Sequence, residues 1–139
     1  MTHIRAFAVR DTESVIDLWQ ETGLTRSWNN PHLDIRRKLS VQPELFLVAE
    51  DGGDIVGSVM AGYDGHRGWI YYLASSPQRR GEGIARDLLA HVEELLLEMG
   101  CPKVQLMVRP GNEDVLGLYD KLGYERFSTT TTGKRLIAD

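Results

Sequence analysis

The sequence lacks the features that stabilise some small proteins without a large hydrophobic core, such as disulfides and structural metal sites. Cys101 is the single cysteine among 139 residues, which excludes an internal disulfide, and no Cys/His cluster has the spacing of a zinc site. No apolar run approaches the roughly 18 residues of a membrane span, since the longest leucine block is Leu95–Leu97. Basic residues do not predominate either. The chain has 16 Lys and Arg residues and 20 Asp and Glu residues, which give a net charge of −4. This charge argues against general nucleic-acid binding.

What is present is the composition of one ordinary globular domain. Hydrophobic residues make up 42% and charged residues 26% of the chain, and this length can bury a core without metal or disulfide. We therefore expect residues 1–139 to form a single domain. The first residues enter a strand-like pattern rather than a signal peptide, so we expect a cytoplasmic protein with no membrane partner, either an enzyme or a small-ligand binder.

Apolar spacing predicts a mixed α/β fold. The clearest element is a long helix over Ile84–Met99, whose apolar residues recur every three or four positions before Gly100 and Pro102 end it. The other predicted elements are a strand over Ile4–Val9, a helix from the N-cap Asp11 to Gly23, a short helix opened by Pro31, a hairpin over residues 45–62, a strand over Trp69–Ala74, a strand over Val104–Val108, a helix from the cap Asn112 to Gly123, and strands over Tyr124–Phe127 and Thr131–Ile137.

The segment from Ser75 to Ala85 carries the most chemistry, because it joins a predicted strand to the start of the long helix. Gly81 and Gly83 leave their backbone amides unobstructed, and the first amides of a helix have no partner within it. Arg79 and Arg80 add positive charge. Such a place suits a pyrophosphate; the alternative is a flexible turn with two surface arginines.

This segment does not match either of two common nucleotide-binding motifs. A Walker A loop requires Lys followed by Ser or Thr after its last glycine, where this chain has Ile84-Ala85. A Rossmann fingerprint requires a third small residue where Arg86 stands.

The remaining pattern, Gln78-Arg79-Arg80-Gly81-Glu82-Gly83, resembles the signature of the GNAT superfamily of acyl-CoA-dependent N-acyltransferases. A second family pattern reads Asn112, Val115, Leu118-Tyr119 and Gly123-Tyr124, and departs only in Val115, where a smaller residue is usual. The segments Trp28–Pro31 and Gly62–Gly68 are similar to a bacterial branch of YpeA type. The resemblance spans essentially the whole chain. It implies a mixed, mostly antiparallel twisted sheet of six to seven strands with about four helices, in the order β-α-α-β-β-β-α-β-α-β-β.

The resemblance also implies an acetyl-CoA cosubstrate, no metal, and direct attack by a primary amine. The amides of Arg79–Ala85 would hold the CoA pyrophosphate, and Leu73–Ser75 would pair with the pantetheine arm like an added strand. The Leu73 amide would polarise the thioester carbonyl. The residues implied to bind the cosubstrate are Leu73, Ala74, Ser75, Gln78, Arg79, Arg80, Gly81, Glu82, Gly83, Ile84, Ala85 and Asn112, the last also being a helix cap.

Tyr119 falls where the family places the acid that protonates the departing thiolate, and its alternative role is that of a core tyrosine. The candidate bases or members of a water relay are Tyr71, Tyr72, Asp64 and His66. Strand alternation puts Tyr71 and Tyr72 on opposite faces, so at most one would face the substrate. His66 beside Asp64 could equally order a turn.

Trp28 and Asn29 lie between the first two predicted helices, where the family builds its acceptor site, although Trp28 could simply pack under the turn. The resemblance implies that the acceptor would be a small-molecule or peptide amine, and the sequence does not choose among a peptide α-amine, an amino acid and a polyamine. The protein would be a monomer, or a homodimer paired through its late strands. Two other functions stay open: a non-catalytic module that binds or senses acyl-CoA, and a phosphate-binding interaction domain unrelated to CoA.

Overall fold

The computed structural model describes residues 2–139 and divides into two compact units, one ending at Leu106 and the other spanning Met107–Asp139. The first unit holds a sheet and three helices, and the second holds one short helix. Within the described part of the chain, no helix is long and apolar enough to cross a membrane.

The sheet of the first unit has five strands in the order β1-β2-β3-β4-β5, antiparallel except for the parallel pair β4–β5. The predicted mixed, mostly antiparallel sheet is therefore confirmed, but with five strands instead of six to seven. The elements of this unit are β1 (His3–Ala6), α1 (Thr12–Glu21), α2 (Pro31–Leu39), β2 (Phe46–Asp51), β3 (Asp54–Tyr63), β4 (Gly68–Ser75), α3 (Ile84–Glu98) and β5 (Val104–Leu106), with short 3-10 turns η1 (Val9–Asp11), η2 (Pro43–Leu45) and η3 (Pro77–Arg79).

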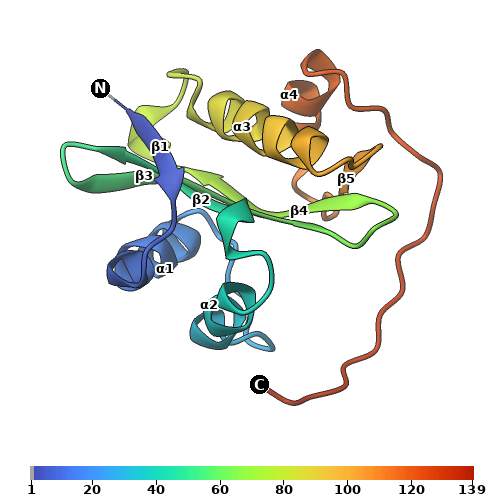
Figure 1. The fold of residues 1–139 in the computed structure, drawn as a ribbon, viewed down its shortest axis with the longest axis horizontal. Coiled ribbons are helices and arrows are strands. Elements are labelled where there is room, and N and C mark those ends of the chain that lie inside the picture. Colours follow the sequence, from blue (N-terminus) through green and yellow to red (C-terminus); the bar gives the residue numbers. More distant parts are fainter. Residues whose placement is uncertain (1) are drawn as a thin grey trace. The chain divides into compact units, whose positions relative to one another are not determined.

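Helices α1 and α2 cover one face of the sheet and α3 covers the other (Figure 1). On the α1 face, Trp19 is fully buried and lies in one apolar cluster with Phe46, Val48 and Met60. On the other face, α3 approaches β3 so closely that a Cβ at Gly57 would lie 2.6 Å from Ile84 Cγ2. This layer order leaves the segment between β4 and α3 at the end of the sheet.

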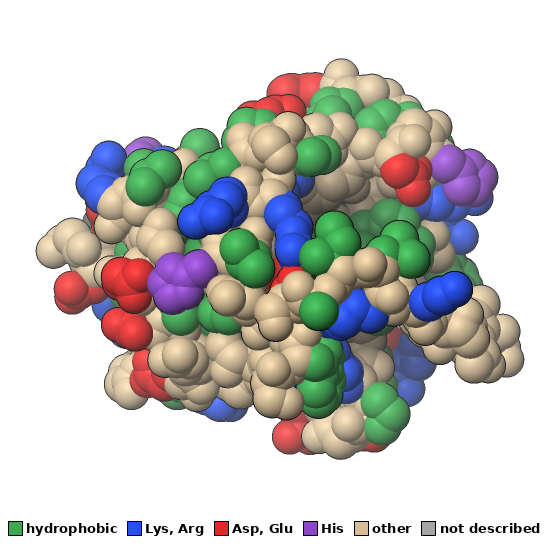
Figure 2. All heavy atoms as spheres, turned by 90° about the horizontal axis from the view of Figure 1, so that it is seen from below, with side chains coloured by type: hydrophobic (Ala, Val, Ile, Leu, Met, Phe, Trp, Pro, Cys, Tyr) green, Lys and Arg blue, Asp and Glu red, His purple; other side chains and the backbone are tan. Residues whose placement is uncertain are grey.

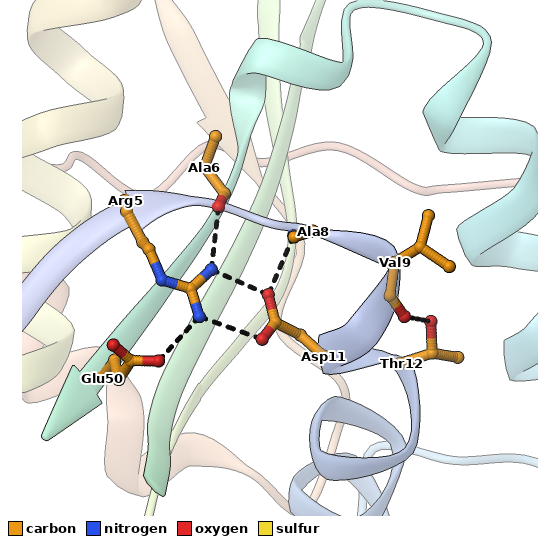
Figure 3. A network of polar contacts seen from close by, with 7 residues as sticks. All are labelled: Arg5, Ala6, Ala8, Val9, Asp11, Thr12 and Glu50. Atoms are coloured by element: carbon orange, nitrogen blue, oxygen red, sulfur yellow. Dashed lines mark hydrogen bonds and ion pairs between the residues drawn. The ribbon is translucent and has the colours of Figure 1, made fainter. Parts of the chain in front are cut away.

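A buried carboxylate fixes the start of α1 (Figure 3). Asp11 occupies the predicted N-cap position, but its side chain does not cap α1. Its oxygens instead accept hydrogen bonds from Arg5, at 2.8 and 2.9 Å, and from the Ala8 amide at 2.8 Å, while Arg5 also pairs with Glu50 at 2.8 Å. The network therefore joins β1, the start of α1 and β2.

The second unit contains η4 (Glu113–Val115) and α4 (Leu116–Lys121). Asn112 holds the predicted N-cap position, but its carbonyl, not its side chain, accepts the hydrogen bond, from the Val115 amide. The strands predicted over Tyr124–Phe127 and Thr131–Ile137 are wrong, because the described residues after Gly123 form neither helix nor strand. The physical reason is visible in the sequence: between residues 128 and 135 no apolar side chains alternate to give a buried face.

Candidate functional site

The loop between β4 and α3 has the backbone shape that its glycines predict. Gly81 and Gly83 adopt φ angles of +82° and +79°, a left-handed conformation that L-residues with a Cβ rarely take. Among the described residues, the amides of Ile84, Ala85 and Arg86 have no acceptor, as expected for the first turn of a helix. The loop thus presents amide donors where a pyrophosphate is predicted to bind.

The charges of this loop are more constrained than the sequence suggests. The Arg79 guanidinium forms ion pairs with Asp51 at the end of β2 and with Glu82, the latter at 2.9 Å. Arg80 is exposed, and Arg86 lies 3.5 Å from Asp87. The local positive charge of Arg79 is therefore already compensated by two carboxylates.

Gln78, the first residue of the motif, ties the loop to α1. Its amide nitrogen donates to Glu21 at 2.9 Å, and its amide oxygen accepts from the Ser76 hydroxyl at 2.7 Å. These contacts give Gln78 a structural role in holding the loop.

Strand β4 contains a bulge that the sequence did not predict. Ser58 pairs with Ala74 and Met60 pairs with Tyr71, so β3 has one residue where β4 has two, Tyr72 and Leu73. Tyr72 adopts φ +52° there. The bulge interrupts the alternation of side chains, so the prediction that Tyr71 and Tyr72 face opposite sides is wrong: both line one pocket.

The free edge of β4 begins just before the bulge. The parallel pairing with β5 ends at Ile70 and Leu106, so Tyr71–Ser75 have no partner strand on that side within the first unit. The Ser58 hydroxyl donates to the Tyr72 carbonyl at 3.0 Å, which directs that carbonyl toward β3. Because the carbonyl and the amide of one trans peptide point in opposite directions, the Leu73 N–H points away from β3, toward the free edge.

The pocket lies on the α2 side of the sheet and has a volume of about 330 Å³. Its lining residues are Asp34, Arg37, Lys38, Val41, Met60, Tyr71 and Tyr72. The Tyr72 hydroxyl donates to Asp34 Oδ2 at 2.6 Å, and Lys38 Nζ donates to the Ala61 carbonyl. Burial lowers the pKa of Lys38, with Glu44 acting in the opposite direction, whereas burial and then Asp64 raise the pKa of Tyr71. The pocket therefore combines one carboxylate, two cationic side chains and two phenols.

Sequence reasoning did not identify Asp34 or Lys38 as site residues. Asp34 occupies the first turn of α2, where an acidic residue is ordinary, and its contact with Tyr72 spans 38 residues. No local motif connects the two. Only the packing of α2 against β4 brings them together.

The remaining candidates lie elsewhere in the first unit. Asp64 accepts hydrogen bonds from the amides of Arg67 and His66 at 2.7 and 2.8 Å, and these bonds lower its pKa. His66 is exposed in the same turn, and neither residue lines the pocket. Trp28 is 53% exposed, and Trp28 and Asn29 lie in the connection between α1 and α2, outside the pocket lining.

The second unit carries Tyr119 and Asn112. Tyr119 lies on α4, half-buried, with its ring centroid 5.7 Å from that of Tyr124. Burial raises the pKa of Tyr119, so its phenol stays protonated well above neutral pH. An acid must hold its proton until the leaving group needs it, and this environment meets that condition.

Three comparisons with known proteins agree with one another. The sequence model of the acetyltransferase (GNAT) family matches residues 10–124, a range that runs across both units. An acetyltransferase of Pectobacterium atrosepticum is 55% identical over 136 residues, 98% of this chain and 96% of the relative. Ard1 from Thermoplasma volcanium has a similar structure, with a TM-score of 0.80 and 28% identity over 91% of this chain and 84% of that one. AAC(6')-Iy, solved with the bisubstrate analogue CoA-S-monomethyl-acetylneamine, gives a TM-score of 0.79 over 99% of each chain, and at 17% identity this likeness concerns the fold alone.

Proposed function

Because the chain belongs to the acetyltransferase (GNAT) family, we propose that it moves an acetyl group from acetyl-CoA to a primary amine by direct attack, as one domain over residues 1–139. The observation that carries the proposal is that two groups of backbone N–H donors follow each other along one stretch of chain. The Leu73 amide points to an unpaired edge of β4, and from eleven residues later the amides that begin α3 have no acceptor among the described residues.

The cosubstrate would bind along this stretch from thioester to phosphate. The edge formed by Leu73–Ser75 would hydrogen-bond the pantetheine arm as an added strand. The amides of residues 79–85 would bind the pyrophosphate, helped by the dipole of α3. Asn112 would make a further pantetheine contact. AAC(6')-Iy was solved with a CoA-containing ligand on the same fold, which supports this choice of cosubstrate.

The acceptor amine would enter the pocket beside α2, because Tyr71 and Tyr72 of its lining directly precede Leu73. The attacking nitrogen must first lose a proton. Tyr72 would accept it on its oxygen while passing its own proton to Asp34, which lies 2.6 Å away. Tyr71 is the weaker candidate for an ionised base, since its raised pKa disfavours the phenolate. The acceptor is a small-molecule or peptide amine.

The transfer itself would form a C–N bond and break a C–S bond. As the nitrogen attacks, negative charge develops on the thioester oxygen and is stabilised by the Leu73 amide. When the tetrahedral carbon collapses, the C–S bond breaks and the departing CoA thiolate takes the proton of Tyr119. The nitrogen, positively charged after its attack, releases its extra proton to solvent, and solvent returns a proton to the Tyr119 phenolate.

Ligand binding and turnover test this proposal separately. Acetyl-CoA at about 100 times its dissociation constant would add roughly 2.7 kcal/mol to the free energy of unfolding, seen as a raised melting temperature. ATP and NAD would give smaller shifts, and a larger shift with either would contradict the proposal. Thiol release on adding a panel of amines would demonstrate transfer, whereas binding without release would identify a non-catalytic acyl-CoA-binding module.

A matched pair of variants locates the binding site. Gly81 and Gly23 both have positive φ, +82° and +74°, and no atom lies within 4 Å of a Cβ added at either. Gly81→Glu and Gly23→Glu therefore introduce the same charge and similar backbone strain, about 1–2 kcal/mol. Only Gly81→Glu should abolish the thermal shift with acetyl-CoA, and equal effects of the two would contradict the assigned site.

A further inference from the structure

Tyr72 is held in an unfavourable backbone conformation by three separate contacts. Its φ of +52° is unusual for an aromatic residue and persists only where the surroundings enforce it. Its ring stacks on Trp19 with centroids 3.8 Å apart and an interplanar angle of 12°. Its hydroxyl donates to Asp34, and its carbonyl accepts from Ser58. Ring, hydroxyl and backbone are thus each fixed by a different element of the first unit.

Ser58 has a specific place in this arrangement. It is fully buried on β3, and its Oγ accepts a hydrogen bond from Trp19 Nε1 at 2.9 Å while donating to the Tyr72 carbonyl at 3.0 Å. The indole N–H leaves the hydroxyl with a single donor direction, toward that carbonyl. Successive hydrogen bonds of this kind also polarise one another.

The peptide that accepts from Ser58 is the peptide whose N–H belongs to Leu73. We propose that Ser58, oriented by Trp19, is a positioning residue for acyl transfer: it holds the Tyr72–Leu73 peptide so that the Leu73 N–H faces the thioester oxygen. The inference rests on the proposed function, in which the Leu73 amide binds the thioester oxygen. What it adds is the residue that orients this amide, Ser58. Polarisation of the carbonyl strengthens the N–H on the other side of the same peptide as a donor.

Kinetics provide the first test. In Ser58→Ala the Tyr72–Leu73 peptide loses its anchor, so kcat should fall about tenfold or more, part of the 100- to 1,000-fold expected for loss of an oxyanion donor. The dissociation constant for CoA should change less than twofold, because CoA lacks the acetyl carbonyl oxygen that the Leu73 N–H would contact. Ser58→Thr keeps a hydroxyl and should recover most of the lost kcat even if it is less stable.

A destabilised control separates positioning from stability. Val92 is fully buried on α3, and Val92→Ala weakens the core without touching the bulge. It should lower the melting temperature but leave kcat near the wild-type value at a temperature where all variants are folded. A similar loss of kcat in Val92→Ala and Ser58→Ala would overturn the assignment.

A spectroscopic readout does not depend on turnover. Infrared spectra of acetyl-CoA labelled with ¹³C at the thioester carbonyl should show a lower stretching frequency when bound to the wild type than when free, because the Leu73 amide polarises that carbonyl. The shift should shrink in Ser58→Ala and return in Ser58→Thr. Equal shifts and equal kcat in wild type and Ser58→Ala would refute the role of Ser58. If the wild type neither binds acetyl-CoA nor releases thiol, the proposed function itself fails.

Discussion

Asp11 shows how one side chain can determine local stability and its pH dependence. Hydrogen bonds from Arg5, with a smaller contribution from the Ala8 amide, lower the pKa of Asp11 despite the opposing effect of burial. Because the folded-state pKa lies below the unfolded value of about 3.9, the resulting stabilisation is present above that pH. It is lost as the pH falls through the folded-state value.

The variant Asp11→Asn should therefore lose about 2 kcal/mol of unfolding free energy at pH 7, because neutral Asn removes the buried ionic partner of Arg5 and leaves only Glu50 to pair with it. The difference from wild type should shrink as the pH is lowered below 4. Urea denaturation between pH 3 and pH 7 measures both effects. Asp17→Asn, an exposed position on the same helix, removes the same charge and should change stability by less than about 0.5 kcal/mol. A pH-independent difference for Asp11→Asn would contradict the explanation.

Tyr119 offers a second prediction for a single residue. Tyr119→Phe removes the proposed acid, so kcat should fall by roughly 100-fold while CoA affinity stays the same. Since burial raises the pKa of Tyr119 above its ordinary value of about 10, the wild-type rate should show no loss below pH 10 that traces to this group. Tyr124→Phe is the matched control, with its ring 5.7 Å away. Steady-state rates that fall equally in both variants would remove Tyr119 from the mechanism.

Among whole elements, those with strong local patterns were predictable. The long helix predicted over Ile84–Met99 forms as Ile84–Glu98, and the hairpin predicted over residues 45–62 forms as β2 and β3. The bulge in β4 was not predictable, because Tyr72 is neither glycine nor asparagine and its positive φ depends on Trp19, Asp34 and Ser58. Long-range contacts decide such positions, and no local pattern encodes them.

The contact between α3 and β3 yields a prediction about packing. A Cβ at Gly57 would lie 2.6 Å from Ile84 Cγ2 and 3.2 Å from the Ala74 carbonyl oxygen, so Gly57→Ala should destabilise the protein by about 1–3 kcal/mol. Gly62→Ala, on the same strand, would meet nothing closer than 3.6 Å and should cause no comparable loss. Chemical denaturation of both variants tests the contact, and equal stabilities would show that α3 does not approach β3 this closely.

For the molecule as a whole, backbone protection should differ sharply along the chain. The residues after Gly123 lie outside helices and strands, whereas Val48 and Val59 are fully buried in the sheet. Hydrogen exchange followed by mass spectrometry should find fast exchange over residues 125–139 and slow exchange in β2 and β3. Protection over residues 125–137 that increases with protein concentration would contradict this expectation and would indicate that two copies of the chain associate through this segment.

The surface carries charge without a strong overall field. The face in Figure 2 mixes acidic, basic and apolar side chains, and the net charge is −4. An anionic cosubstrate is therefore not drawn in by the molecule as a whole. In the proposed function, its recognition would depend on the local donors of the β4–α3 loop.

The pairing of Arg79 has a consequence for the heat of binding. In the free protein this guanidinium is shared by Asp51 and Glu82. A diphosphate that attracts Arg79 would remove one of the groups that hold the pKa of Asp51 below its usual range, so Asp51 would then bind a proton more readily. Complex formation would take up protons from the buffer. Calorimetric titrations in buffers with different ionisation enthalpies would reveal this exchange, and the apparent affinity would rise in mildly acidic solution.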